Sequence, residues 1–524
     1  MHISGYVRSF LACTALTLSV IPVAAQLTDV GTLGGPASTA RGVNDSGHVV
    51  GTADTGPDTH RAFLYIAGTM TDIGALGGVN SEARAINASG QIAGRASTAG
   101  GYSHGFLYTN GKFEEIGDFG GPSSGAVDLN DAGQVTGYAH IDDEEGSHRV
   151  FLYENGQMFN LGTLGGNHSD AYDINNAGQI VGPARTPNKF SHAYLYTGRI
   201  MKDLGTLGGD SSVAYAVNES GQVVGFAHDS DGFSVAFLYT DGVMMNLGAL
   251  GGSFSDAYAI NGAGQVVGSA QTGFGTYHAF LYEDGVMADL GTFGGSDSEA
   301  RVIAPDGTVY GWAQVPGGSH HLFRYEGGQM RDLGGLGGAE LFVEAISPNG
   351  RYVVGRGMTA GGVFHGYLYD AFSIAPETLT MYRGTIVSGS LPSLHNSDNL
   401  RLVVKPGFVF STFEPPIQVI VNATSPSASP ASLSFSVESH ASIANAQQKV
   451  SLYNFVTQSF EVLDTRMATT SDSTVQINVT SNTSRFVQPG SLLITARVSY
   501  KALGPLFGYP WHARIDQTKW IIPG

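Results

Sequence analysis

Residues 255–290, SDAYAINGAGQVVGSAQTGFGTYHAFLYEDGVMADL, contain four short strand-like stretches that decide the fold of this chain. We expect strands at residues 257–261, 265–268, 278–282 and 286–290, because β-branched and aromatic residues alternate there with small or polar ones. Glycine-containing turns of three to four residues join several of these stretches, as in β-hairpins. No part of the segment has the 3.6-residue period of an amphipathic helix. The segment therefore predicts a four-stranded antiparallel sheet.

This phrase is repeated eight times and fills about two-thirds of the 524-residue chain. Successive copies are 43 residues apart in six of the seven steps and 45 apart in the other. A period in the low forties with four short strands per copy is typical of one blade of a β-propeller. Each copy is marked by a diglycine, at Gly34–Gly35, Gly77–Gly78, Gly120–Gly121, Gly165–Gly166, Gly208–Gly209, Gly251–Gly252, Gly294–Gly295 and Gly337–Gly338.

A turn of the form Asn-x-x-Gly follows the first strand of six copies, from Asn44 to Asn261. Glycine supplies a positive φ there, and asparagine hydrogen-bonds within its own turn. In the last two copies, Pro305 and Pro348 stand in the alignment where the asparagine is expected. We interpret these turn residues as architectural rather than as ligands.

The two ends of the repeat array complement each other. The chain begins the array with a lone fourth-strand phrase, residues 27–31, and the last copy stops after its third strand, residues 366–369. We predict that these segments pair, which would hide two edge strands and close a ring. An open solenoid would need polar capping repeats, and the sequence has none. The predicted fold class is therefore all-β, with an eight-bladed β-propeller at residues 26–371 closed by an N-terminal strand.

The phrases His278-Ala-Phe280, Asp289-Leu-Gly291 and Gly294-Gly295, with Gly-Gln-Val-Val-Gly at 264–268, resemble a known repeat family. It is the bacterial extracellular family named for its His-Ala-Phe (HAF) triplet, and the resemblance covers residues 27–370. It implies secretion and a repeat structure, and no assigned activity. This chain departs from the family in that tyrosine ends the Phe-Leu-Tyr phrase where the family often has tryptophan.

The first residue of the triplet is charged or a histidine in seven of the eight copies. Metal binding needs three or four ligands that converge within a few ångström, and residues repeated from blade to blade away from the axis do not converge. We therefore interpret this position as one that hydrogen-bonds at a strand start. The series is Arg61, His104, Arg149, His192, Val235, His278, His321 and His365.

Segments on both sides of the repeats have a different composition. Residues 1–25 predict a secretory signal peptide, because a mostly apolar stretch from Phe10 to Val23 leads to small residues at the cleavage position. The stretch is too short to span a bilayer comfortably, which disfavours a membrane anchor. The only cysteine, Cys13, lies in this segment, so the mature chain would have no disulfide. We expect the protein to be secreted, either extracellular or periplasmic.

Residues 372–524 contain less glycine and about eight further strand-like stretches separated by Asn-, Ser-, Pro- and Thr-rich turns. This pattern predicts a C-terminal β-sandwich of the jelly-roll or Ig-like kind. Pro505, Tyr509, Trp511 and Trp520 would suit a sugar-stacking platform, since aromatic rings pack on apolar sugar faces. The alternative is that these tryptophans and the tyrosine belong to the core.

The formal net charge is −18 and no basic run occurs, so nucleic acid and anionic membrane surfaces are poor partners. No segment after residue 25 is long and apolar enough to cross a bilayer. We therefore predict no nucleic acid partner and no membrane insertion. Nothing in the sequence indicates the oligomeric state.

The first strand of each repeat should be innermost, because the fourth strand is the one that closes the ring. The residue three before each turn then faces the channel, and these residues change character around the ring. One arc carries arginines and a glutamate, and the other carries three tyrosines. Such a rim suits a sugar acid, an acidic polysaccharide or another planar anion, because arginine forks grip carboxylates. The predicted ligand-binding residues are Arg41, Arg84, Tyr172, Tyr215, Tyr258, Arg301 and Glu344.

The alternative for this rim is that its side chains fill the gaps between blades and pair locally, as Glu344 would with the arginines. Two other positions of the first strand are nearly constant. The residue before the channel-facing one is alanine in seven copies, and the residue just before the turn is always Val, Ile or Leu. These two sets should pack against opposite neighbouring blades.

Motifs of known enzymes are missing from the sequence: we find no nucleophile elbow, His-Glu-x-x-His or Walker loop. No metal site or cofactor is predicted. Residues 142–145 (Asp-Asp-Glu-Glu) and 229–232 (Asp-Ser-Asp-Gly) offer oxygen atoms to Ca²⁺, but neither has a complete ligand series, so solvated turns are the prediction.

These observations favour a secreted, non-enzymatic binding or surface-interaction protein whose ligand is a carbohydrate or a protein. The variable loops between the second and third strands put recognition at one face of the propeller. The alternative is a carbohydrate-active hydrolase or lyase with its site at the axis. Asp128 and Asp173, one residue after the channel series in neighbouring blades, would then be its catalytic carboxylates.

Overall fold

The computed structural model describes residues 27–141, 147–395, 400–409, 414–503 and 511–523. The chain forms two compact units, Ala25–Ile374 and a second one that begins at Ala375. Their division is close to the predicted boundary after residue 371. The predicted signal peptide, residues 1–25, lies outside the described residues.

Eight antiparallel sheets of four strands make up the first unit within the described residues. In seven of them the strand order follows the sequence, so each sheet is a simple meander. The first four sheets are β2 (Ser38–Val43), β3 (Val49–Gly56), β4 (Thr59–Ile66), β5 (Thr69–Gly74); β6 (Gly77–Ile86), β7 (Ile92–Thr98), β8 (Ser103–Thr109), β9 (Lys112–Gly117); β10 (Gly120–Leu129), β11 (Val135–Ile141), β12 (His148–Glu154), β13 (Gln157–Asn160); and β14 (Asp173–Ile174), β15 (Ile180–Arg185), β16 (Ser191–Thr197), β17 (Ile200–Gly205).

The next three sheets are β18 (Gly208–Val217), β19 (Val223–Asp229), β20 (Ser234–Thr240), β21 (Val243–Gly248); β22 (Gly251–Ile260), β23 (Val266–Thr272), β24 (Tyr277–Glu283), β25 (Val286–Gly291); and β26 (Ser298–Ile303), β27 (Val309–Gln314), β28 (His320–Glu326), β29 (Gln329–Gly334). The last sheet is β30 (Gly337–Ile346), β31 (Tyr352–Thr359), β32 (Phe364–Asp370) and β1 (Thr28–Asp29), and β33 (Ser373–Ile374) follows it.

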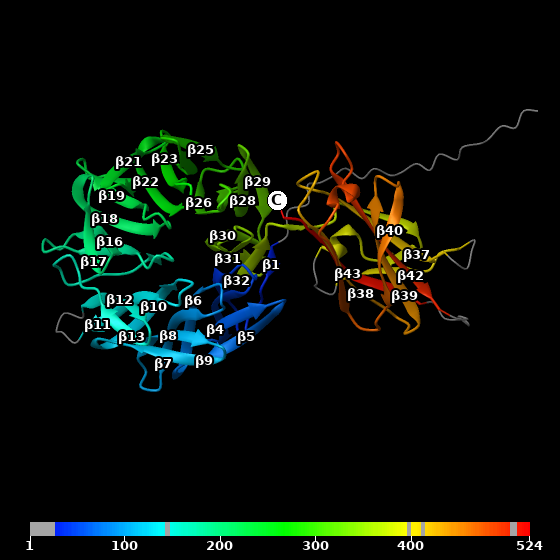
Figure 1. The fold of residues 1–524 in the computed structure, drawn as a ribbon, viewed down its shortest axis with the longest axis horizontal. Helices are drawn as coiled ribbons and strands as arrows, with labels where there is room; N and C mark the ends of the chain where they lie inside the picture. Colours follow the sequence, from blue (N-terminus) through cyan, green and yellow to red (C-terminus); the bar gives the residue numbers. More distant parts are fainter. Residues whose placement is uncertain (1–26, 142–146, 396–399, 410–413, 504–510, 524) are drawn as a thin grey trace, which may run out of the picture. The chain divides into compact units, whose positions relative to one another are not determined.

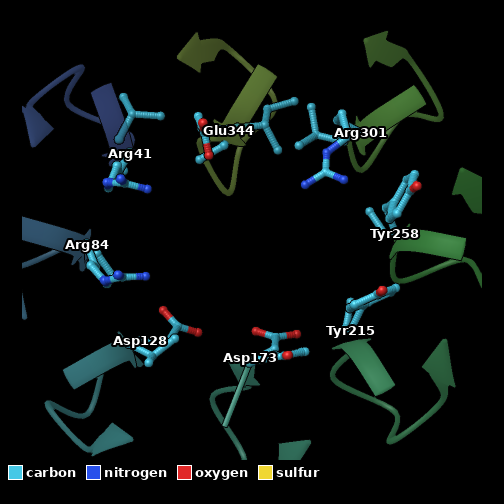
Figure 2. Close-up of a pocket in the computed structure, with 18 of the residues that line it drawn as sticks. Arg41, Arg84, Asp128, Asp173, Tyr215, Tyr258, Arg301 and Glu344 are labelled. Carbon is cyan, nitrogen blue, oxygen red and sulfur yellow. The ribbon is translucent and has the colours of Figure 1, made fainter. Parts of the chain in front are cut away.

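The sheets stand side by side around a central opening, with the first strand of each sheet nearest the axis (Figures 1 and 2). This radial arrangement of four-stranded meanders is a β-propeller. Alanine in the first strand lets neighbouring sheets approach closely: Ala40, Ala83 and their counterparts are at most 1% exposed. The third strand of the same sheet contributes an aromatic ring to the hydrophobic cluster around each alanine: Phe63 joins Ala40 and Phe280 joins Ala257, and both rings are fully buried.

A recurring serine ties seven of the eight sheets to the one before it, and Leu341 stands at this position in the last sheet. Ser81 Oγ donates to the carbonyl of Gly74 at the end of the previous sheet and accepts the N–H of Ala62, 2.9 Å away. The hydroxyl therefore satisfies two backbone groups of one neighbour at once. The same pair of bonds is made by Ser38, Ser124, Ser169, Ser212, Ser255 and Ser298.

The turn asparagines do more than cap their own turns. Asn44 Oδ1 accepts the N–H of His48, as predicted, and its Nδ2 donates to the carbonyl of Asn87 in the next sheet, 3.1 Å away. Six such bonds link consecutive turns up to Ala304. The alignment that put Pro305 and Pro348 at this position is wrong by one residue, because Gly307 and Gly350 close their turns on Ala304 and Ser347.

Where the HAF-type triplet begins with histidine, the imidazole hydrogen-bonds an acidic residue on the fourth strand of its own sheet. His278 Nδ1 lies 2.9 Å from both carboxylate oxygens of Asp289. The same pair joins His192 to Asp203 and His321 to Asp332. Where the fourth strand has Asn246 instead of an acid, the triplet begins with the apolar Val235. The position is thus a strand-to-strand contact, consistent with its interpretation from the sequence.

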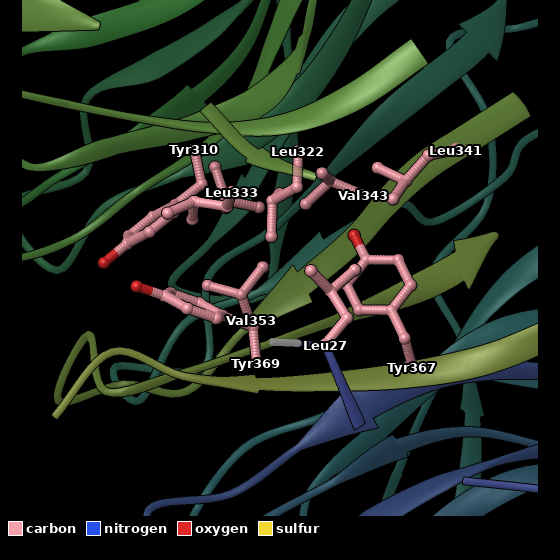
Figure 3. Packing of buried hydrophobic residues seen from close by; sticks show 10 residues of the cluster. Leu27, Tyr310, Leu322, Leu333, Leu341, Val343, Val353, Tyr367 and Tyr369 are labelled. Atoms are coloured by element: carbon pink, nitrogen blue, oxygen red, sulfur yellow. The ribbon is translucent and has the colours of Figure 1, made fainter. Parts of the chain in front are cut away.

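The N-terminal strand β1 completes the last sheet. Thr28 and Asp29 pair with Leu368 and Tyr367 of β32, as the complementary array ends predicted. Asp29 accepts a hydrogen bond from His365, which repeats the His–Asp pair with residues from opposite ends of the unit. Leu27 is 6% exposed and packs among Tyr310, Leu322, Leu333 and other apolar residues of the last two sheets (Figure 3).

The second unit contains two antiparallel sheets and two single-turn 3₁₀ helices. One sheet has the order β35 (Thr385–Ser388), β36 (Leu402–Lys405), β43 (Ala513–Ile521), β38 (Leu433–Ala441), β41 (Ser473–Val479). The other has the order β34 (Thr378–Arg383), β37 (Ile417–Thr424), β42 (Leu493–Ala502), β39 (Ala446–Asn454), β40 (Ser459–Met467), and the helices are η1 (Leu391–Leu394) and η2 (Thr483–Phe486). No helix in the described part of the chain is long and apolar enough to cross a membrane.

The suggested sugar platform of the second unit is wrong where it can be checked. Trp511 and Trp520 are 3% and 1% exposed, so their rings belong to the core and cannot stack on a sugar. Pro505 and Tyr509 lie outside the described residues. A buried polar group joins the two sheets: Gln448 of β39 and Tyr500 of β42 both hydrogen-bond Ser439 of β38.

Deleting residues 27–31 should lower the midpoint of thermal unfolding by several degrees, because Leu27 and Val30 lose their buried positions and β32 becomes an edge strand. The matched control is Thr28→Ala, at an exposed position of the same strand, which should leave the midpoint within about one degree. Differential scanning calorimetry compares the variants. An unchanged midpoint after the deletion would show that strand β1 does not hold the ring together.

Candidate functional site

A cavity of about 680 Å³ lies on the axis of the first unit (Figure 2). Its wall comes from the first strands of all eight sheets, as expected for innermost strands. The structure brings together every predicted ligand-binding residue and both candidate carboxylates on this wall: Arg41, Arg84, Asp128, Tyr172, Asp173, Tyr215, Tyr258, Arg301 and Glu344.

A β-bulge in the first strands explains why two consecutive residues face the cavity. In β10, Ala126 pairs with Gly137 and Asp128 with Thr136, so Val127 is left as an extra residue without a partner. The same shift occurs in the first strands β2, β6, β18, β22, β26 and β30. Simple alternation of strand faces would have turned Asp128 away from the side that residue 127 faces.

Glycine in the second strand makes room for this bulge. A Cβ atom at Gly268 would lie 1.9 Å from the carbonyl oxygen of Asp256, and one at Gly51 would lie 2.0 Å from that of Thr39. Backbone therefore occupies the space of a side chain at this point, and only glycine fits. The glycine that ends each Val-Val-Gly-type motif is therefore needed for the first strand to form the channel wall.

Arg41 and Arg84 form the positively charged side of the cavity. Glu82, the nearest acid, accepts a hydrogen bond from Arg95 at 2.8 Å and lies 3.6 Å from Arg84. Arg41 has no ion pair within 4.0 Å among the described residues, and its buried Nε lacks a hydrogen-bond partner there. Burial and the charge of Arg41 lower the pKa of Arg84 below its usual value, a sign of crowded positive charge.

Two other charged residues of the wall are neutralised locally. Arg301 lies 3.6 Å from Glu299 and stacks over the ring of Tyr258, 4.4 Å from its centroid. Glu344 lies 3.9 Å from Arg356. Local pairing, the alternative considered from the sequence, therefore describes Arg301 and Glu344. Their partners are Glu299 and Arg356, and Arg301 and Glu344 do not pair with each other. Local pairing does not describe Arg41.

Three tyrosines make an aromatic arc on the wall. The rings of Tyr172 and Tyr215 are stacked with centroids 5.9 Å apart, and Tyr258 follows at 5.8 Å from Tyr215. Tyr172 is 44% exposed, so part of the arc is open to a ligand. Burial raises the pKa of Tyr215 to about 12, which keeps its hydroxyl group protonated as a hydrogen-bond donor at neutral pH.

Asp128 and Asp173 form a coupled carboxyl pair between Arg84 and the tyrosine arc. Asp128 accepts hydrogen bonds from the N–H groups of Leu129 and of Ile174 in the next sheet, and Asp173 accepts one from Val217, 2.7 Å away, in the sheet after that. The two carboxyl groups lie within hydrogen-bonding reach of each other. Burial and the charge of Asp173 raise the pKa of Asp128 well above its usual range, which favours a proton shared between the two carboxyl groups.

Two other clusters were not found from the sequence. His148, His168, Asp170 and Arg185 line a smaller cavity of about 160 Å³, with His148 Nε2 3.0 Å from Asp170. In the second unit, one oxygen each of Glu438, Asp472 and Asp516 lie within 4.8 Å of one another. Apart from His168 and Asp170, which lie two residues apart, the members of each cluster come from separate segments of the chain, and only the fold brings them together.

Of the two acidic turns considered for Ca²⁺, only the one at residues 229–232 lies within the described residues. Residues 142–145 lie outside the described residues. In the second turn, Asp229 accepts hydrogen bonds from the N–H groups of Asp231 and Phe233. The carboxylate therefore stabilises its own turn, which agrees with the prediction of a solvated turn.

No family profile and no curated protein matches this chain in sequence. Among solved structures, the β-propeller domain of the trilobed protease from Pyrococcus furiosus is similar over 57% of this chain and 97% of its own, with 12% identity and a TM-score of 0.38. A puromycin hydrolase is similar over 64% of this chain and 59% of its own, with 14% identity and a TM-score of 0.40. A family 29 carbohydrate-binding module is similar over 27% of this chain and 90% of its own, with 15% identity and a TM-score of 0.16.

Replacing Asp173 with asparagine should stabilise the protein at neutral pH. The amide oxygen can still accept the N–H of Val217, and the amide nitrogen can donate to Asp128 where the shared proton lies in the wild type. Because burial raises the pKa of Asp173 and Asp128 in the folded state, the contribution of this pair to stability is most favourable below the usual pKa of a free carboxyl group and falls as the pH rises through the raised pKa values.

The gain from Asp173→Asn should therefore be small near pH 4 and grow as the pH rises toward 7, because the wild-type carboxyl group must then ionise in a site that raises its pKa. Thermal unfolding between pH 4 and pH 8 measures it. Asp58→Asn removes an equal charge at an exposed site and should show no such pH dependence. A gain that is the same at both pH values would contradict the shared proton.

Proposed function

We propose that this protein is a secreted, non-enzymatic carbohydrate-binding protein and that its ligand occupies the axial cavity. In this proposal the first unit is an eight-bladed β-propeller of HAF-type repeats closed by its N-terminal strand, and residues 372–524 form a β-sandwich that adds a second contact surface. The observation that carries the proposal is the wall of the cavity. Unneutralised arginine, stacked tyrosine and carboxyl oxygen face one space there.

The size of the cavity favours a small ligand over a protein surface. Ligand pockets commonly measure about 300–1,000 Å³, and the axial cavity of about 680 Å³ falls in this range. A protein partner needs an interface of about 800 Å² on each side, which an enclosed channel wall does not offer. A saccharide uses both kinds of group present, because its hydroxyls hydrogen-bond to charged side chains and its apolar faces pack on aromatic rings.

The runner-up, a hydrolase or lyase at the axis, is less well supported by the geometry. Glycosidases hold two carboxyl groups about 5–5.5 Å apart when they retain configuration and about 6.5–9.5 Å apart when they invert it. Asp128 and Asp173 are close enough to share a hydrogen bond, and backbone N–H groups already occupy oxygens of both.

The paired substitution Arg41→Gln and Arg84→Gln should weaken glycan binding at least tenfold. Each arginine removed takes away a charge-assisted contact worth roughly 1.5–3 kcal/mol. The fold should persist, because Glu82 keeps its hydrogen bond from Arg95 and two crowded positive charges are relieved. Glycan-array binding followed by calorimetry on the best ligand provides the measurement.

The control is Arg331→Gln, which removes an arginine from an exposed position of outer strand β29. It should bind glycans as the wild type does. Equal binding by the paired variant and the wild type would remove the channel as the site. Release of new reducing ends from a bound saccharide by the purified protein would replace the binding proposal with the enzymatic one.

A further inference from the structure

The order of groups around the cavity wall selects among carbohydrates. Figure 2 shows Arg41, Arg84, Asp128, Asp173, Tyr215 and Tyr258 following one another around the opening, with the arginine and aspartate side chains directed toward it. A ligand lying along this wall meets positive charge first, then a pair of carboxyl groups and then aromatic rings. The arrangement is a sequence of three chemically different contacts, each with its own requirement.

The arginine end requires an anionic group. Three arginines, at positions 41, 84 and 95, surround the single carboxylate of Glu82. Burial opposes ionisation of Glu82, but the hydrogen bond from Arg95 and the three positive charges outweigh it, so the pKa of Glu82 is lowered and its charge is already present. The excess of positive charge is thus not removed by Glu82. A planar carboxylate fits two guanidinium groups better than any neutral group does.

The Asp128–Asp173 pair requires hydroxyl groups. The equivalent position in the other six sheets is Gly42, Ala85, Ala216, Ala259, Val302 or Ala345, so packing of the ring does not need a carboxyl group there. Two half-buried carboxyl groups close to each other cost free energy unless something compensates. Both line the cavity, and a carboxylate offers about four acceptor sites, of which the backbone bonds use one or two on each residue.

We propose that the channel binds a uronate residue of an acidic saccharide, with its carboxylate against Arg41 and Arg84 and its neighbouring hydroxyls on Asp128 and Asp173. The inference rests on the proposed function, because it assigns the chemical class of ligand to the same channel. The tyrosine arc then covers the apolar face of the sugar ring. A simple carboxylate satisfies only the arginines, and a neutral sugar satisfies only the carboxyl pair and the tyrosines.

The test compares four probes by isothermal titration calorimetry: digalacturonate, its dimethyl ester, galactobiose and propionate. Digalacturonate should bind at least tenfold more tightly than each of the other three. The substitution Asp128→Ala restores the residue that most other sheets carry, so the fold should be kept. It should weaken digalacturonate at least tenfold and leave propionate unchanged. Arg41→Gln should reduce digalacturonate to the level of its ester.

The outcomes separate the inference from the proposed function. If galactobiose or the dimethyl ester binds in the channel as tightly as digalacturonate, the uronate assignment fails while the carbohydrate-binding proposal stands. Equal affinity for propionate and digalacturonate, or an Asp128→Ala variant with unchanged digalacturonate affinity, overturns the role of the carboxyl pair. Absence of binding to any saccharide, here and on the glycan array, overturns both.

Discussion

The pairing of the first strand with the last hairpin is the contact on which the rest of the first unit depends. Each sheet buries its faces only against its two neighbours, so a break anywhere in the ring exposes two faces at once. Two contacts close the ring where the two ends of the repeat array meet. Strand β1 pairs with β32, and Ser38 hydrogen-bonds both Gly31 and Gly366. The axial cavity exists because this circle is complete.

The same constraint separates structural positions from functional ones. Close approach of the first strands requires Ala40 and its counterparts, and the bulge requires glycines such as Gly51 and Gly268. The bulge then directs two residues per sheet toward the axis, and the ring tolerates Gly, Ala, Val or Asp at one of them and Arg, Tyr, Val or Glu at the other. Chemistry varies where packing leaves the residue type free.

Sequence patterns predicted much of this architecture because each copy repeats the same local rules. The strand order, the closing pair of Thr28 and Leu368 and the channel-facing series were all visible in the repeat. The bulge could not be predicted from the sequence, because it depends on which residue of the second strand pairs with Asp128. The second unit has no repeat from which to predict how its strands pack. The burial of Trp511 and the cluster of Glu438, Asp472 and Asp516 were therefore not predictable from a sequence pattern.

The net charge of −18 does not decide which ligands the channel accepts. Charges in solution act over about 8–10 Å before salt screens them, whereas Arg41 and Arg84 act on a ligand within the cavity at contact distance. The acidic exterior therefore slows the approach of anions at low salt without cancelling the local excess of positive charge inside. In the proposed function, selectivity for an anion then arises only after entry, from guanidinium groups that the fold leaves without a full complement of acids.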